Sequence, residues 1–194
     1  TVKDYPFSWS DNMSLKGLRV GVFEGKRQPG EQEAIDILKE RGAKIVPVEL
    51  PSDLPVQALV MILFTEAGTV FDDITRDGIT EGLNSWPRLF RRARFTNAAD
   101  YLKANRIRTQ LIHQMRETMK DIDLYIGSPG PELVITNLTG HPTVVMPAGF
   151  NENDGVKTPF SVTMTGRLFG ESKLLAAAHA FQQETSYHRE RPPI

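Results

Sequence analysis

The sequence contains no cysteine, which excludes disulfides, thiolate nucleophiles, iron–sulfur clusters and cysteine-based zinc sites. It also lacks an excess of charge, because 23 Lys and Arg stand against 24 Asp and Glu, for a formal net charge of -1. No broad basic field is available to attract phosphate backbones or anionic lipid. No apolar run approaches the roughly 20 residues that a membrane-spanning helix needs. We therefore expect no nucleic acid and no membrane as partners.

What is present is the composition of an ordinary globular protein. The chain has 194 residues, of which 40% are hydrophobic and 24% are charged. This length supports one substantial hydrophobic core, and the composition is too apolar for a disordered chain. We expect a single domain, residues 1–194.

The start of the chain leaves its compartment open. It lacks a basic and then apolar signal pattern, but it begins with Thr1 rather than Met. A targeting segment could therefore have been removed, and the cytoplasm is only slightly favoured.

The opening segment predicts a strand, a helix and a second strand. Residues 18–23 and 43–48 are short β-rich runs, and residues 31–41 carry apolar side chains at helical spacing before Gly42. A strand–helix–strand unit of this length normally forms parallel strands with a right-handed crossover. The predicted fold class is therefore α/β, with a mixed sheet of about four to six strands flanked by helices.

Apolar periodicity predicts the remaining elements in the same way. Residues at intervals of three or four indicate buried helices, and short alternating or apolar runs indicate strands. An Asn97–Asp100 pair resembles the cap at the start of the longest helix. The predicted elements are helices over 56–77, 97–122 and 174–185, strands over 123–126, 143–146 and 159–165, and a loop with a short helical piece over 78–95.

No known catalytic motif is complete in this sequence. Its four histidines lack metal-binding spacing, and the phosphate-binding glycine motifs are not completed, so we expect no metal and no cofactor. None of the nine serines lies in Gly-x-Ser-x-Gly. Ser128 in GSPG is the one serine whose loop resembles an active-site corner, but no partner base stands out. By its residues alone the chain is not a complete enzyme.

One basic stretch, RLFRRARF at 88–95, has two interpretations. Its arginines could clamp an anion, and Phe90 and Phe95 could stack on bases. Because the whole chain is nearly neutral, a solvated helix face or an interface is the preferred interpretation.

A family pattern begins with TNLTGHPTVVMPAGF at 136–150 and continues through TPFSVTMTGRLFGESKLL. Its elements are Asn-Leu-x-Gly-x-Pro, an apolar strand, Pro-x-Gly, a further strand and Gly-x-x-Phe-x-Glu-x-x-Leu-Leu. This order resembles the C-terminal part of the amidase signature family, which includes glutamyl-tRNA amidotransferase A subunits and fatty acid amide hydrolases. The matching residues are Asn137, Leu138, Gly140, Pro142, Pro147, Gly149, Gly166, Phe169, Glu171, Leu174 and Leu175.

The resemblance implies hydrolysis of a linear amide C–N bond. In the family, a Ser nucleophile, a Ser with a cis peptide and a Lys act together in a preceding Gly- and Ser-rich signature. No Gly-Ser-Ser-Gly stretch occurs in these 194 residues. We therefore expect a C-terminal domain that contributes scaffold and substrate-pocket walls and has no catalytic residues of its own. In the complete enzyme its partners are an amide substrate and the missing N-terminal amidase half.

Polar residues at the strand ends are the candidates for the pocket wall, because loops there expose side chains beside a core. For Asn137, a structural role in the turn is as well supported as substrate contact. The family pattern Pro-Thr-x-Pro is replaced by GSPGP, so substrate preference does not carry over. The candidates are Ser128 and Pro129 after one strand, and Thr136, Asn137, Thr139 and His141 before the next.

Two other classes of protein remain as alternatives. The first is a non-catalytic module that binds a small molecule or a protein on an amidase-like scaffold. The second is an unrelated flavodoxin-like binding domain, since the opening strand–helix–strand unit is generic. The second ranks last because it leaves the pattern at 136–175 without an explanation.

We predict that the chain forms dimers or larger species. Surfaces that pack against the N-terminal half in the family would expose apolar side chains here, and such patches promote self-association. Light scattering measures the mass in solution. A clean monomer without an apolar patch would count against this prediction.

Overall fold

The computed structural model describes residues 6–153 and 155–191, and the chain divides into two compact units. Unit 1 comprises the chain up to Leu50 and again from Met115 onward, and unit 2 is Pro51–Gln114. The single domain expected from the sequence stays a prediction, because two compact units can still unfold as one.

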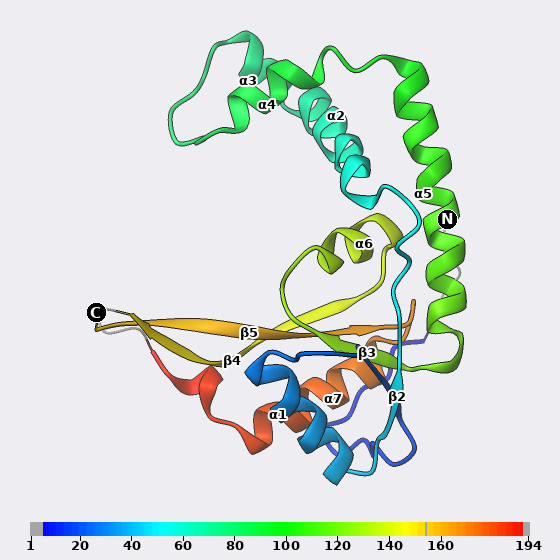
Figure 1. Ribbon diagram of the computed structural model, residues 1–194. Coiled ribbons are helices and arrows are strands. Elements are labelled where there is room, and N and C mark those ends of the chain that lie inside the picture. The colour runs from blue at the N-terminus through cyan, green and yellow to red at the C-terminus, as the bar shows by residue number, and fades with distance from the viewer. Residues whose placement is uncertain (1–5, 154, 192–194) are drawn as a thin grey trace. The chain divides into compact units, whose positions relative to one another are not determined.

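Unit 1 is built on a mixed sheet of five strands in the order β2-β1-β3-β5-β4 (Figure 1). β1 is parallel to both β2 and β3, whereas β5 is antiparallel to β3 and β4. The predicted α/β class, the parallel opening unit and the mixed sheet are therefore confirmed. The strands are β1 (Arg19–Val22), β2 (Lys44–Pro47), β3 (Leu124–Gly127), β4 (Thr143–Asn153) and β5 (Val156–Gly166).

Helices cover the two faces of this sheet unequally. α1 (Pro29–Glu40) and α7 (Glu171–Glu184) pack on one face, and α6 (Glu132–Thr139) lies on the other (Figure 1). Side chains alternate along a strand, so Leu124 and Ile126 of β3 point to the α1 and α7 side, where the main core lies. Three short 3-10 helices complete the described chain: η1 (Val56–Val60) in unit 2, and η2 (Met119–Asp121) and η3 (Tyr187–Arg189) in unit 1.

Unit 2 is helical. After η1 follow α2 (Met61–Val70), α3 (Asp72–Arg76), α4 (Trp86–Ala93) and the start of α5 (Ala98–Thr118), which continues into unit 1. The short helical piece predicted within 78–95 is α4. The predicted cap of the longest helix is also present, because Asn97 Oδ1 accepts a hydrogen bond of 2.9 Å from the backbone N–H of Asp100.

The prediction of one buried helix over 56–77 is wrong in two respects. The chain breaks into three helices, with a non-helical residue at Phe71. Leu63 and Val70, expected in the core, are 54% and 73% exposed. The covered face of α2 is instead set by Gly68, where α4 approaches so closely that an added Cβ would lie 2.6 Å from the Cβ of Ala93.

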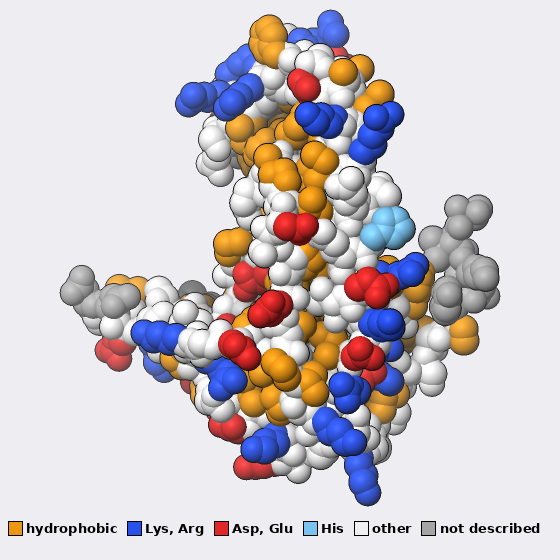
Figure 2. Space-filling model, turned by 45° about the vertical axis from the view of Figure 1, so that its right-hand side comes forward, with side chains coloured by type: hydrophobic (Ala, Val, Ile, Leu, Met, Phe, Trp, Pro, Cys, Tyr) orange, Lys and Arg blue, Asp and Glu red, His pale blue; other side chains and the backbone are white. Residues whose placement is uncertain are grey.

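Large apolar side chains reach the surface of unit 2, as the orange areas among the charged groups in Figure 2 illustrate. Besides Leu63 and Val70 they include Phe71, Trp86 and Phe95, the last of which is 89% exposed. Scattered exposed hydrophobics are normal on soluble proteins, but a group on one small unit favours contact with another surface. Self-association stays a prediction.

The substitution Gly30→Ala tests how tightly α1 packs on the sheet. Gly30 is buried in the first turn of α1, where an added Cβ would lie 2.5 Å from the Cβ of Ala148 in β4. Although Ala is the better helix former, we expect the clash to lower the free energy of unfolding by about 1–3 kcal/mol.

Chemical denaturation at neutral pH measures this change. Lys39→Ala, at an exposed position of the same helix, is the control and should change stability by less than about 0.5 kcal/mol. Equal stability of the Gly30→Ala and parent proteins would show that α1 is not held at this contact.

Candidate functional site

Ser128 follows the buried strand β3, and its side chain is hydrogen-bonded to a residue of unit 1 that is distant in sequence. Its hydroxyl donates a hydrogen bond of 2.6 Å to Oε1 of Glu31, and Oε2 of the same carboxylate accepts one of 3.1 Å from the backbone N–H of Gln28. Glu31 lies in the first turn of α1, so one carboxylate joins the start of this helix to the loop after β3. The orientation of the Ser128 hydroxyl is therefore set by a carboxylate and not by an imidazole or an amine.

The segment after Pro129 is a helix, α6, where the sequence suggested a loop. Pro131 precedes its first turn, and Gly140 ends it with a left-handed φ of 79°, which glycine adopts without strain. These two residues were the available signal for a helix. The β-branched run Val134, Ile135 and Thr136 obscured it, because such residues have low helix propensity.

The helix changes the surroundings of the candidate residues within it. Thr136 and Thr139 are buried, and their hydroxyls donate to the carbonyl oxygens of Leu133 and Ile135 at 3.0 and 2.8 Å. Asn137 lies on the same helix and is exposed. Pro129 lies in the loop before the helix and is also exposed. The two threonine protons are therefore used within the helix, and contact of any of these residues with substrate stays a prediction.

His141 is buried directly after α6 and pairs with Thr139. The distance from Thr139 Oγ1 to His141 Nδ1 is 2.8 Å. Because the single proton of Thr139 goes to Ile135, the imidazole must donate from Nδ1, which leaves Nε2 as a hydrogen-bond acceptor. Burial lowers the pKa of His141, so its ring is neutral at neutral pH. Within the described residues no hydrogen bond joins His141 to Ser128.

The α6 side of the sheet carries polar side chains that the sequence analysis did not single out. Thr163 and Thr165 of β5 are buried, and Thr165 shares a hydrogen bond of 2.9 Å with Thr143 of β4. Tyr125 of β3 is fully buried beside Thr165, and its hydroxyl makes no hydrogen bond of standard geometry within the described residues. The alternation of threonines with Val162 and Met164 was the signal for this polar face.

Glu132 completes this group from the first position of α6. Gly127 has no side chain, and a Cβ added there would lie 3.3 Å from Thr163 Oγ1 and 3.4 Å from Glu132 Oε1. Within the described chain the Glu132 carboxylate has no hydrogen bond or ion pair with a side chain. We call Tyr125, Ser128, Glu31, Glu132 and Thr163 the β3 corner.

Electrostatics at the β3 corner disfavour an additional negative charge. Burial raises the pKa of Tyr125 from its ordinary value of 10.0 to about 12; the Thr165 hydroxyl opposes this shift, and the Glu132 carboxylate adds to it. Two carboxylates and three hydroxyls can accept hydrogen bonds from an amide N–H or an ammonium group. No cationic side chain belongs to the corner.

The described residues, 6–153 and 155–191, hold no cluster of metal ligands and no membrane-spanning helix. They contain no group of three or more His, Cys, Asp or Glu side chains placed to hold a metal ion. None of their helices combines the length and the apolar composition of a membrane span.

The curated relatives of this chain include proteins of two kinds, and no family model matches the sequence. The first kind is the A-type subunit of glutamyl-tRNA(Gln) amidotransferase; that of Neisseria gonorrhoeae is 26% identical over 92% of this chain and 47% of its own length. An amidase of Pseudomonas putida is 28% identical over 93% of this chain and 46% of its own length. The chain spans about half the length of the curated relatives it matches.

Solved structures show the same partial match. A bacterial aryl acylamidase of the amidase signature enzymes aligns with a TM-score of 0.72 at 15% identity, over 94% of this chain and 48% of that one. The peptide amidase of Stenotrophomonas maltophilia aligns with a TM-score of 0.70 at 22% identity, over 93% and 45%. At these identities the likeness is one of fold.

Tyr125 predicts a loss of stability at alkaline pH. Its pKa is higher in the folded protein than the value near 10 of an unfolded chain, so the folded state holds this proton more tightly. The contribution of this proton to the free energy of unfolding is complete below pH 10 and disappears as pH rises through 12. The protein thereby loses up to about 3 kcal/mol of stability.

Urea denaturation between pH 8 and pH 12 measures this loss against a Tyr125→Phe variant. At pH 8 the variant and the parent should have the same free energy of unfolding, because the hydroxyl that the variant lacks makes no hydrogen bond of standard geometry. Above pH 10 the variant should lose less stability than the parent. Parallel curves for the two proteins would show that Tyr125 ionises as freely as an exposed tyrosine.

Proposed function

Because the chain is the C-terminal part of an amidase signature fold, we propose that it supplies sheet strands and one pocket wall to an enzyme that hydrolyses linear amide C–N bonds. The observation that supports this most directly is the β3 corner. At the end of the central strand it places Tyr125 and Glu132 on the α6 side of the sheet, and Ser128 with the Glu31 carboxylate at the start of α1. These groups would bind the amide N–H or the amine of the substrate.

The bond-breaking groups must come from elsewhere. Ser128 is not activated as a nucleophile, because its proton is directed to Glu31, and a carboxylate is a weaker base than an imidazole or a neutral amine. The side chains of the corner also include no cation that would stabilise a tetrahedral oxyanion. We assign nucleophile, base and oxyanion donors to an N-terminal amidase half that carries the Gly- and Ser-rich signature, which is the main partner of this chain in the proposal.

A binding module without catalysis is the second candidate. The hydrogen bonds of Ser128 with Glu31 and of Thr139 with His141 are completed inside unit 1, as in a site that only holds a ligand. The two candidates differ in the reading frame upstream of Thr1. A frame that encodes a Gly- and Ser-rich signature with a Lys supports the amidase, and a start codon next to Thr1 supports the module.

This polypeptide alone should neither hydrolyse amide, ester or aminoacyl substrates nor react with a serine-directed fluorophosphonate. Labelling is measured by fluorescence after denaturing electrophoresis, and turnover against a mock preparation. Ser128→Ala should behave like the parent protein. Labelling or turnover that disappears in the Ser128→Ala variant would contradict the assignment of the nucleophile to another segment.

Activity of the complete enzyme tests the role of the β3 corner itself. When the chain is joined to its upstream half, Glu132→Gln should raise the KM for an amide substrate about tenfold and change kcat less, because a binding contact is lost and not a reacting group. Glu152→Gln, exposed on the β4–β5 hairpin, is the matched control. If both variants have the same KM and kcat as the parent, Glu132 does not contact the substrate and is not part of the pocket wall.

A further inference from the structure

Unit 2 contains a cavity of about 420 Å³ within its own helices. One wall comes from the end of η1 and the start of α2, and the other from the end of α4 and the turn after it. This volume is in the range of small-molecule sites, which are mostly apolar with a few polar groups. The side chains that determine its character are Val60, Met61, Phe64, Leu89, Arg92 and Phe95.

The two walls are held together at several points beside the cavity. Gly68 lets α2 and α4 approach closely at Ala93, and the hydroxyls of Thr65 and Thr96 share a hydrogen bond of 3.2 Å. Because Ala93 and Thr96 also line the cavity, these contacts set the spacing of its walls. The spacing of the two walls therefore comes from the packing of unit 2, and the exposed side chains of Arg92 and Phe95 lie at its surface.

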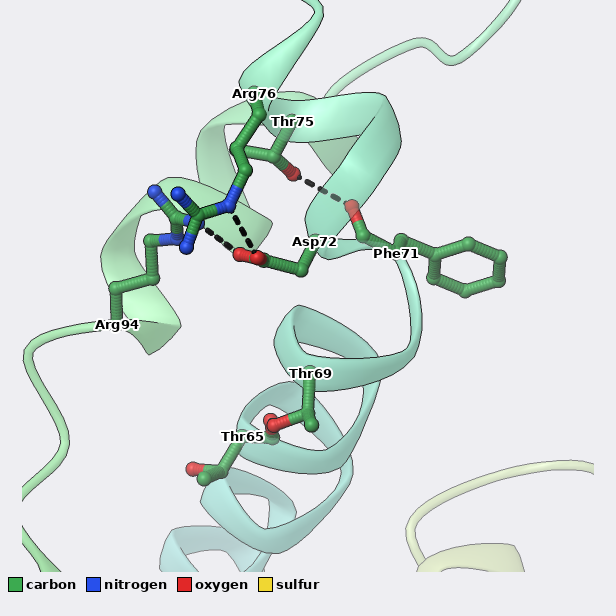
Figure 3. Close-up of polar contacts among 7 residues, drawn as sticks. All are labelled: Thr65, Thr69, Phe71, Asp72, Thr75, Arg76 and Arg94. Atoms are coloured by element: carbon green, nitrogen blue, oxygen red, sulfur yellow. Dashed lines mark hydrogen bonds and ion pairs between the residues drawn. The ribbon is translucent and has the colours of Figure 1, made fainter.

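A carboxylate at the start of α3 holds the end of α4. Asp72 accepts hydrogen bonds from Arg94 and, at 2.5 Å, from Nε of Arg76, and both guanidinium groups point toward it in Figure 3. The hydrogen bonds from Arg76 and then Arg94 hold the pKa of Asp72 below its usual value. Arg94 is thus neutralised within unit 2, which fixes the turn that carries Phe95.

Arg92 differs from Arg94 in that no carboxylate neutralises it. Its guanidinium makes no hydrogen bond or ion pair with the described residues, and none of the residues lining the cavity is Asp or Glu. Arg88 and Arg91 are exposed on the same helix and leave the local charge positive, in agreement with the blue groups around the upper part of Figure 2. An apolar cavity with one unpaired guanidinium complements a ligand with an apolar body and an anionic end.

The aromatic residues argue against a nucleic acid at this surface. Phe90, which could have stacked on a base, is buried and stacks on Trp86 with ring centroids 5.6 Å apart. Phe95 alone of the two phenylalanines in this stretch remains exposed. Successive bases along a strand would therefore find no continuous stacking platform.

We propose that the unit 2 cavity binds a small amphipathic carboxylate, with its alkyl or aryl body against Met61, Phe64 and Leu89 and its carboxylate on Arg92. The apolar contacts provide affinity in proportion to the area they remove from water, and the guanidinium selects for the anion. This inference stands on unit 2 alone and is independent of the amidase proposal.

Trp86 provides the signal for a binding experiment. Its ring lies 6.3 Å from that of Phe64, which lines the cavity. The chain has two tryptophans, so a Trp9→Phe protein reports from Trp86 alone. Octanoate, octanol and octyltrimethylammonium have alkyl chains of nearly equal length and differ in charge. We expect a saturable change in Trp86 fluorescence with octanoate, and binding at least about tenfold weaker for octanol and the cation.

Three variants separate the charge from the cavity. Arg92→Gln should weaken octanoate binding about tenfold and leave octanol unchanged, and Arg88→Gln, exposed on the same helix outside the cavity, should have little effect. Ala58→Phe, at an exposed position of the lining, should weaken both ligands by filling space. Calorimetry on the same proteins checks that the fluorescence change reports binding.

Three outcomes would overturn the proposal. They are equal affinity for the carboxylate and the alcohol, an Arg92→Gln variant that binds octanoate like the parent, and no binding by either method. If the cavity instead receives a side chain of a second copy, Ala58→Phe should reduce the mass measured by light scattering while octanoate does not bind, which also overturns it.

Discussion

The position of β3 between a parallel and an antiparallel neighbour is the constraint on which unit 1 depends. β1 beside it belongs to a strand–helix–strand unit, and β5 on its other side belongs to a hairpin with β4. All four residues of β3 are buried, so its two faces must match two different layers. Leu124 and Ile126 enter the apolar core beneath α1 and α7, whereas Tyr125 points to the polar α6 side.

This division of faces explains why the candidate site lies where it does. The loop after β3 passes the start of α1, and the Ser128–Glu31 hydrogen bond connects them over 97 residues of sequence. α6 then covers the polar face and brings Glu132 next to Gly127. The Ser128–Glu31 pair and the group of Tyr125, Thr163 and Glu132 therefore lie at the end of the same strand because strand pairing brings together segments that no local motif would connect.

Unit 2 uses its arginines for two different purposes within one short stretch. Arg94 shares the carboxylate of Asp72 with Arg76 and so joins the end of α4 to α3, while Arg92, two residues before Arg94, stays unpaired beside the cavity. The sequence presents RLFRRARF as one basic segment and cannot distinguish these roles. Only helix packing assigns Phe90 to the core and Phe95 to the surface.

The sequence by itself determined the fold class, the parallel opening unit, the cap at Asn97 and the resemblance to the amidase signature family. These depend on local periodicity, capping chemistry and short motifs, which are written in consecutive residues. The tertiary structure alone decided that residues 56–77 break into three helices, that 132–139 is a helix, and that Thr136, Thr139 and His141 are buried. The physical reason is that burial and hydrogen-bond partners come from packing between distant segments, as the close approach of Gly68 to Ala93 and the pairing of Ser128 with Glu31 both illustrate.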